Sequence, residues 1–124
     1  MGLFAAALAV TTMLGCSGAP KTHPIALASG PPVEVLEEKV EEFKDVQGVQ
    51  RRIYSAEYVS AQNFEDQDAL YKEMGQVFTV YECRVDQGGF KKLTLTPMKR
   101  EAGDSLEGRP FYLERRPDGR WNVL

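Results

Sequence analysis

Residues 1–15 contain no charged side chain and are mostly alanine, leucine, valine, methionine and threonine. A secretory signal needs about 7 to 15 apolar residues and then a small residue at the cleavage site. Residues 3–14 and Gly15 meet both requirements. The run is shorter than the about 20 apolar residues of a membrane-spanning helix. The sequence therefore predicts that residues 1–15 are an export signal and that the folded domain is built from residues beyond it. The alternative is a buried N-terminal helix with Cys16 as a core thiol.

The signal ends in Met13-Leu14-Gly15-Cys16, which resembles the lipobox of bacterial lipoproteins. In that family the cysteine receives a thioether-linked diacylglycerol and becomes the mature N-terminus. The resemblance implies a lipidated Cys16 and a membrane anchor in the bacterial cell envelope. Ser17, which follows the cysteine, implies by the same resemblance the outer membrane, facing the periplasm. Two features depart from the family pattern: Leu14 stands where a small residue is usual, and no basic residue precedes the apolar run.

The rest of the chain divides by composition. Residues 17–32 are rich in proline, serine, glycine and alanine, the composition of a flexible to semi-extended tether. Residues 33–124 suffice for one small domain, near the size at which a single core gives only marginal stability. We therefore expect a signal peptide over 1–15, a lipidated cysteine and tether over 16–32, and one globular domain over 33–124.

Charge is distributed unevenly along that domain. The whole chain has a net charge of −3, which argues against nucleic acid as a partner because nucleic-acid binding needs a basic surface. Residues 33–86 carry 13 acidic and 6 basic side chains, a net charge of −7, whereas residues 90–124 carry 5 and 8, a net charge of +3. Complementary faces of one domain explain this asymmetry. The alternative is a basic half that faces phosphate or acidic glycan.

Two prolines and a periodic apolar pattern mark the start of the domain. The apolar positions recur at spacings of three, four and three, with glutamates between them: Val33, Leu36, Val40 and Phe43. This pattern, after Pro31 and Pro32, predicts an amphipathic helix that ends near Gly48.

The remaining segments read mostly as strands. We expect strands over 49–61, 76–86 and 90–100, a short helix within 63–75, a hairpin turn at 86–89, a loop over 102–109, and a terminal hairpin of 111–116 and 120–124 around Pro117-Asp118-Gly119. Pro97 indicates an edge or a bulge in its strand. The predicted fold is α+β: one N-terminal amphipathic helix packed on an antiparallel meander of four to five strands, a roll or open barrel. This element order is similar to that of cystatin-like and NTF2-like rolls.

Cys83 is the only cysteine besides Cys16. It falls in an alternating stretch, the predicted strand 76–86, whose members on one face are Val77, Thr79, Tyr81, Cys83 and Val85. That position predicts a buried thiol acting as a small hydrophobe. A Cys16–Cys83 disulfide and a reactive nucleophile are the alternatives.

Residues that carry catalytic or metal chemistry are scarce. The single histidine, His23, lies in the tether, where no packed scaffold orients it as a base. Metal-ligand spacing and nucleotide-binding loops are not recognisable in the sequence. We expect no catalytic residues, no metal and no cofactor, and an enzyme is the least favoured function.

An exposed aromatic and basic patch on the terminal hairpin is the predicted contact surface: Tyr112, Arg115, Arg116, Arg120 and Trp121. Tyrosine, tryptophan and arginine are the residue types that dominate interface hot spots. The leading hypothesis is a lipid-anchored, non-catalytic interaction module that binds an envelope protein through a sheet edge or this hairpin. The alternative is a small-ligand or lipid-binding roll with an apolar interior pocket.

Overall fold

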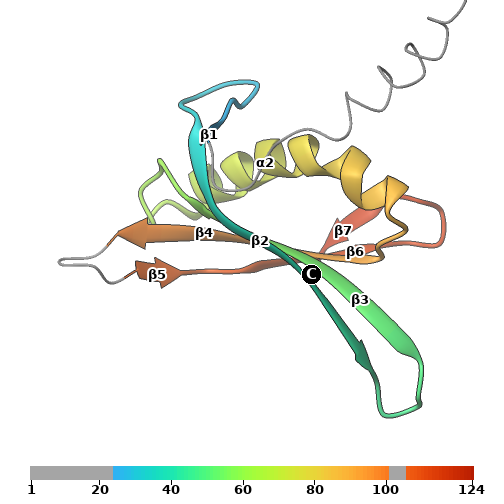
Figure 1. The fold of residues 1–124 in the computed structure, drawn as a ribbon. Helices are drawn as coiled ribbons and strands as arrows, with labels where there is room; N and C mark the ends of the chain where they lie inside the picture. The colour runs from blue at the N-terminus through green and yellow to red at the C-terminus, as the bar shows by residue number, and fades with distance from the viewer. Residues whose placement is uncertain (1–23, 101–105) are drawn as a thin grey trace, which may run out of the picture.

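The structure is a computed structural model that describes residues 24–100 and 106–124. Residues 1–23, with the predicted signal and Cys16, lie outside this part. The described residues form a seven-stranded sheet with one helix lying across it (Figure 1). In chain order the elements are β1 (Pro24–Ile25), β2 (Val33–Lys44), β3 (Gln50–Val59), α2 (Gln67–Gln87), β4 (Lys92–Arg100), β5 (Leu106–Gly108), β6 (Phe111–Arg115) and β7 (Trp121–Val123).

The strands follow the spatial order β1-β2-β3-β4-β6-β7, with β5 paired to the end of β4. β3 and β4 are parallel, and the other paired strands are antiparallel. Parallel neighbours need a long crossover connection, and α2 provides it. The helix therefore packs on the middle of the sheet and covers one of its faces (Figure 1).

The predicted N-terminal helix is wrong, because residues 33–44 form the long strand β2. β2 pairs with β3 from Glu34 opposite Val59 to Lys44 opposite Gln50. Its buried apolar residues are Val33 and Val35, two apart as in a strand, not the helical set. Pairing along the whole of β3 overrides the local helical periodicity, since tertiary context outweighs propensity.

The turn after β2 carries a signal that a helix end and a hairpin turn share. Gly48 has a φ of 81°, and a left-handed glycine ends a helix or closes a hairpin equally well. Asp45 Oδ1 accepts hydrogen bonds from the backbone N–H groups of Gln47 at 2.8 Å and Val49 at 3.0 Å. These bonds make residues 45–48 a tight hairpin turn that fixes the register of β2 against β3.

The predicted strand 76–86 is also wrong, because it lies within the 21-residue helix α2. Val77, Tyr81 and Val85 are buried at intervals of four, whereas Thr79 and Cys83 are exposed. These three apolar residues recur every fourth position, which places them on one face of a strand as well as on one face of a helix. The sequence pattern is therefore compatible with both structures. The helix adds further buried positions in the same stripe, at Leu70 and Met74.

Local signals fix both ends of α2. The Asp66 side chain caps the first turn by accepting a hydrogen bond from the Ala69 N–H at 3.0 Å. At the other end the Gly88 N–H donates to the Arg84 carbonyl at 3.0 Å, and Gly89 has a φ of 73°. The glycines predicted to form a hairpin turn at 86–89 therefore end the helix.

The fold class is corrected accordingly: the only helix of the described residues lies in the middle of the chain and covers one face of a curled, largely antiparallel sheet. The predictions of strands over 49–61 and 90–100, and of the terminal hairpin, are confirmed by β3, β4 and the β6–β7 pair. Pro97 is central, not at an edge, because β4 lies between β3 and β6. On the edge of β4 that pairs with β6 and β5, Pro97 lies between Leu95, the last residue paired with β6, and Met98, the first residue paired with β5. No strand hydrogen bond on that edge therefore requires a backbone N–H group at position 97.

Part of the predicted tether belongs to the sheet. Pro24 and Ile25 form β1 and pair with Glu34 and Val33. Ile25 is 5% exposed and packs in the core. The described domain therefore begins its packing before residue 33.

A buried carboxylate joins β2, β3 and α2. Glu38 is 6% exposed. Its two oxygens accept hydrogen bonds from the Tyr54 hydroxyl at 2.8 Å, the Tyr81 hydroxyl at 2.5 Å and Arg84 Nη1 at 2.9 Å. Arg84 also donates to the Tyr54 hydroxyl at 2.9 Å. Such a cluster stabilises the fold only when every member is satisfied, and here each one has a partner.

We predict that Glu38→Gln lowers the free energy of unfolding by about 3 kcal/mol, because the change leaves the Arg84 charge without its carboxylate. Denaturant unfolding at neutral pH measures the loss. The matched control is Glu41→Gln on the same strand, where the Lys39–Glu41 ion pair of 3.5 Å is exposed and is worth less than about 1 kcal/mol. Equal losses in the two variants would contradict a structural role for the buried cluster.

We also predict that the domain loses stability as the pH rises above about 10, the ordinary pKa of tyrosine. Burial raises the pKa of Tyr54, Tyr58 and Tyr81, and the hydrogen bond to Glu38 adds to the rise for Tyr81. A pKa raised on folding gives stability that is complete below the unfolded pKa and is lost as the pH climbs toward the folded one. Unfolding midpoints between pH 8 and pH 11 measure the loss, and Tyr81→Phe should flatten the profile.

Candidate interaction surface

The two faces of the sheet differ in what covers them. Alternate residues of β3 and β4 point to opposite faces. One set is buried toward α2: Tyr54, Ala56 and Tyr58 on β3 and Leu93, Leu95 and Pro97 on β4. The other set, Ile53, Ser55 and Glu57 with Lys92, Thr94 and Thr96, is only partly buried. We call the face that carries this second set the open face, since α2 lies on the opposite side.

The open face is hollowed by a groove of about 580 Å³. It runs over β2, β3, β4 and β6, and its walls mix apolar and charged side chains, among them Ile53, Tyr112, Leu124, Lys39, Glu41 and Lys92. Its lining includes Ile53, Ser55 and Glu57 of β3 and Lys92, Thr94 and Thr96 of β4, all from the open face, and no residue of α2. The groove is thus a surface feature and lies outside the core between sheet and helix.

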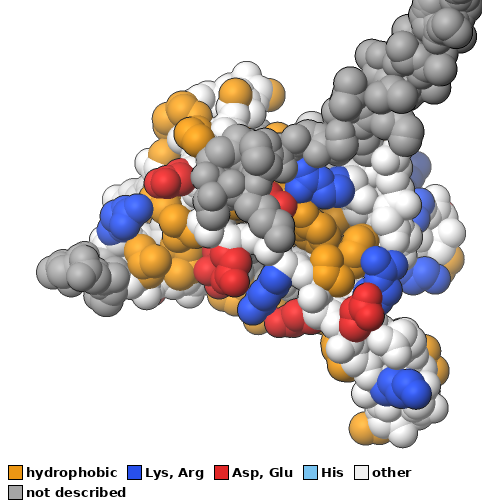
Figure 2. Space-filling view, in the orientation of Figure 1, with side chains coloured by type: hydrophobic (Ala, Val, Ile, Leu, Met, Phe, Trp, Pro, Cys, Tyr) orange, Lys and Arg blue, Asp and Glu red, His pale blue; other side chains and the backbone are white. Residues whose placement is uncertain are grey.

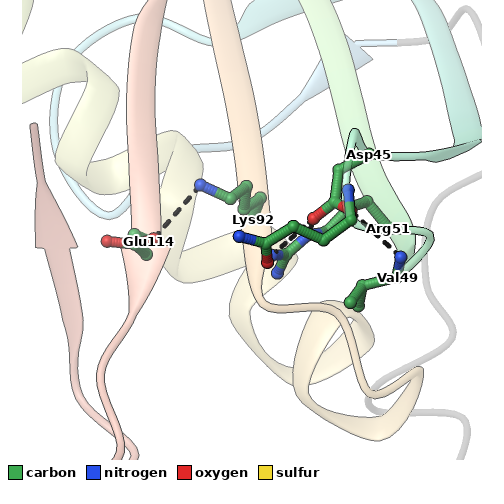
Figure 3. Close-up of polar contacts among 6 residues, drawn as sticks. Asp45, Val49, Arg51, Lys92 and Glu114 are labelled. Atoms are coloured by element: carbon green, nitrogen blue, oxygen red, sulfur yellow. Dashed lines mark hydrogen bonds and ion pairs between the residues drawn. The ribbon is translucent and has the colours of Figure 1, made fainter.

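Charges along the open face are paired with one another. Lys92 Nζ lies 3.1 Å from Glu114 Oε2, and Lys39 Nζ lies 3.5 Å from Glu41 Oε2. Figure 3 shows Lys92 reaching across to Glu114 on β6. Exposed pairs of this kind are worth at most about 1 kcal/mol each to stability. Their side chains can therefore be rearranged by a partner at little cost.

The five residues of the predicted contact surface do not form one patch. Tyr112 lies on the open face, lines the groove and is 54% exposed. Arg115 and Trp121 lie on the helix side, where both approach Asp86. Arg116 and Arg120 flank the hairpin turn and are exposed. The predicted contact residues of the β6–β7 hairpin thus lie on both faces of the sheet and at the hairpin turn.

Trp121 has a structural environment. Its Nε1 donates to Asp86 Oδ1 at 3.0 Å, and its ring centroid lies 5.9 Å from that of Phe78 on α2. A shallow apolar hollow of about 160 Å³ adjoins it, lined by Tyr71, Met74, Phe78, Leu113, Trp121 and Val123. Trp121 therefore helps to attach the end of the sheet to the helix.

Cys83 is not the buried thiol on a strand that the sequence predicted. It lies on the exposed side of α2 and is disulfide-bonded. Cys16, the only other cysteine of the chain, lies outside the described residues. An acyl thioether on Cys16 and a Cys16–Cys83 disulfide exclude one another, because both use the same sulfur.

Residues 24–100 and 106–124 bring together no three histidine, cysteine, aspartate or glutamate side chains that could hold a metal ion. In the same part of the chain, no helix is long and apolar enough to cross a membrane. His23 lies outside the described residues.

Several residues of the groove were not predicted. Ile53, Lys92 and Leu124 line it, and none stood out in the sequence. The available signal was the alternation of buried and partly buried side chains along β3 and β4. When two such strands are parallel neighbours, their partly buried side chains lie on the same face of the sheet. That signal is usable only once the two strands are known to be adjacent.

Protein-family models, curated proteins and solved structures were compared with this chain, and none matches it. The chain's own residues and geometry therefore carry the functional inference.

Proposed function

We propose that this protein is an exported, non-catalytic interaction module of the bacterial cell envelope that binds another protein through its open face. The observation that carries the proposal is the groove of about 580 Å³ on the sheet face opposite α2, with the half-exposed Tyr112 in its wall. A concave surface with an exposed tyrosine and rearrangeable charges is the kind of surface that supplies interface hot spots.

Its lining favours a protein over an apolar small molecule as the occupant. The groove lies outside the core, and two ion pairs, Lys39–Glu41 and Lys92–Glu114, stand at its walls. Pockets for apolar ligands enclose most of the ligand surface and contain few polar groups. A partner segment with both apolar and charged side chains fits this lining better.

Two features support export. The uncharged apolar run of residues 1–15 has the composition of a secretory signal. The disulfide of Cys83 is a bond that persists in oxidising compartments such as the periplasm and is rare in the cytosol.

The membrane anchor is proposed to be a diacylglycerol on Cys16, as the lipobox-like residues 13–16 imply, with the outer membrane as its location. The disulfide of Cys83 stands against this part of the proposal when its partner is Cys16. A lipidated molecule needs the Cys16 sulfur for the thioether, so Cys83 would then have to be reduced or bonded to another molecule.

Intact-mass analysis of protein from the membrane fraction tests the anchor. We expect a mass that lacks residues 1–15 and carries acyl chains. Cys16→Ser should release the protein from the membrane fraction. A soluble wild-type protein that gains the mass of two hydrogens on reduction would contradict the anchor and establish the intramolecular disulfide instead.

Capture of envelope proteins by the folded domain tests the open face. We predict that Tyr112→Ala weakens binding of a captured partner about 30-fold, the effect of losing a hot spot worth about 2 kcal/mol. Titration of the purified partner measures the affinity, and thermal melting confirms that the variant is folded.

The matched control is Tyr71→Ala, since Tyr71 is exposed to a similar extent, 52% against 54%, but lies on α2 away from the open face. Binding should survive this change. A partner that is lost with Tyr71→Ala and kept with Tyr112→Ala would place the contact on the helix side and refute the open face as the binding site.

A further inference from the structure

The outer edge of β2 is mostly without a neighbouring strand. β3 pairs with the inner edge of β2 along its length, whereas within residues 24–100 and 106–124 the outer edge is paired only by β1, at Val33 and Glu34. β2 continues from there to Lys44, and its side chains are exposed from Lys39 onward. An unpaired strand edge is a template on which another strand can pair.

The hairpin turn shows which backbone groups this edge presents. The Asp45 N–H donates to the Val49 carbonyl at 3.0 Å, so the backbone of Asp45 is directed at β3. Hydrogen-bonded and non-hydrogen-bonded positions alternate along an antiparallel pair, and the register is unbroken over residues 37–44. The even-numbered residues of 38–44 therefore direct their N–H and C=O groups away from β3. Val40 is one of them, and it is 46% exposed.

The side chains of this stretch select one way of pairing with a second copy of the chain. Two copies that extend one sheet are related by a two-fold axis perpendicular to it, and the axis passes through a residue that lies opposite itself. Among residues 37–42, Val40 is the only uncharged one. An axis at any of the others would place a charge directly opposite its own copy, which is destabilising. Val40 also lies near the middle of the free stretch, residues 35–44, so this axis pairs the most residues.

An axis at Val40 brings opposite charges together. Lys39 then lies opposite Glu41 of the second copy, and Glu41 lies opposite Lys39 of the second copy. Within one chain the same two side chains form an exposed ion pair of 3.5 Å. Such a pair is worth at most about 1 kcal/mol and is readily exchanged for contacts between copies. Lysine on a sheet edge usually prevents edge pairing, but here it meets a complementary carboxylate.

Two further acids approach one another in this arrangement, and each already has its own arginine. Glu38 lies opposite Glu42 of the second copy. Arg84 lies 2.9 Å from the Glu38 carboxylate, and Arg52 lies 3.5 Å from the Glu42 carboxylate. Figure 2 shows acidic and basic side chains interspersed where the β2–β3 hairpin leaves the rest of the domain. The edge is therefore self-complementary in charge.

We propose that two copies of this protein associate through residues 38–42 of β2, which pair antiparallel about an axis at Val40 and join two sheets into one. Each Val40 N–H donates to the Val40 carbonyl of the other copy, and Glu38 and Glu42 exchange backbone hydrogen bonds in the same way. The two Val40 side chains cover one another on the face that carries α2. Pairing this short buries less than the about 1,000 Å² of a stable interface, so the dimer is weak and reversible.

Sedimentation velocity of the full-length protein, with both cysteines retained and in density-matched detergent, tests the proposal. We expect a dimer whose fraction rises with protein concentration between about 1 and 500 µM. Val40→Pro should abolish it, because the change removes an outward N–H group that the pairing with β3 does not use. Thermal melting checks that the variant is folded.

Charge reversal tests the register. Lys39→Glu and Glu41→Lys should each weaken self-association about tenfold, because each replaces two opposite-charge contacts between copies with two like-charge contacts. An equimolar mixture of the two variants should regain the affinity of the wild type, since the acids of one variant then face the lysines of the other. The matched controls are Lys72→Glu and Glu65→Lys, which make the same charge changes at exposed positions outside β2 and should each associate like the wild type.

A chain that stays monomeric up to about 500 µM, or charge variants that associate like the wild type, would overturn the proposal. A mixture of the two variants that recovers no association would overturn the register about Val40. Loss of a captured partner with Val40→Pro from a chain that remains monomeric would assign the edge to a strand of another protein. Tyr112→Ala should leave self-association unchanged, so the dimer and the groove of the open face stand or fall separately.

Discussion

The Glu38 carboxylate is the interaction on which the arrangement of this domain depends. It is a charge on β2 that lies inside the protein, where Tyr54 of β3 and Tyr81 and Arg84 of α2 bind its oxygens. A buried charge is tolerated only when its partners are in place, so helix and hairpin must meet in one relative position. The contact fixes where α2 crosses the sheet, and the helix in turn determines which face is covered.

The position of α2 on only one face of the sheet has two consequences for the surfaces that the domain exposes. With α2 on one face, the opposite face keeps its partly exposed alternate residues, which line the groove. Beyond Glu38, β2 and β3 continue past the region that α2 covers, and residues 39–44 and 50–52 are exposed. The described residues thus expose a groove of mixed polarity and, in the turn between β2 and β3, the apolar side chain of Val46.

Sequence reasoning recovered the elements whose local signals agree with their tertiary setting. β3, β4 and the β6–β7 hairpin were predicted because alternation and turn residues indicate the same structure. Sequence reasoning failed where one pattern of apolar residues or glycines is compatible with two kinds of structure. Val77, Tyr81 and Val85 satisfy both a strand and a helix, and Gly48 suits both a helix end and a hairpin. The predicted contact residues were scattered for a related reason: adjacent residues of a strand point to opposite faces, so Tyr112 and Arg115 separate.

By itself the sequence determined the uncharged leading segment, the number of cysteines, the uneven charge and the turn at Pro117-Asp118-Gly119, because these depend on residue identity or on a few neighbouring residues. Tertiary structure alone decided that residues 33–44 are a strand, that Glu38 is buried and that Cys83 faces outward on a helix. Each of these outcomes depends on partners distant in the chain: β3 for the strand, Arg84 for the carboxylate, and the sheet under α2 for the cysteine. Local propensities amount to less than about 1 kcal/mol per residue, whereas burial of a large apolar side chain is worth about 1.5 to 3 kcal/mol. Long-range packing therefore prevails wherever the two disagree.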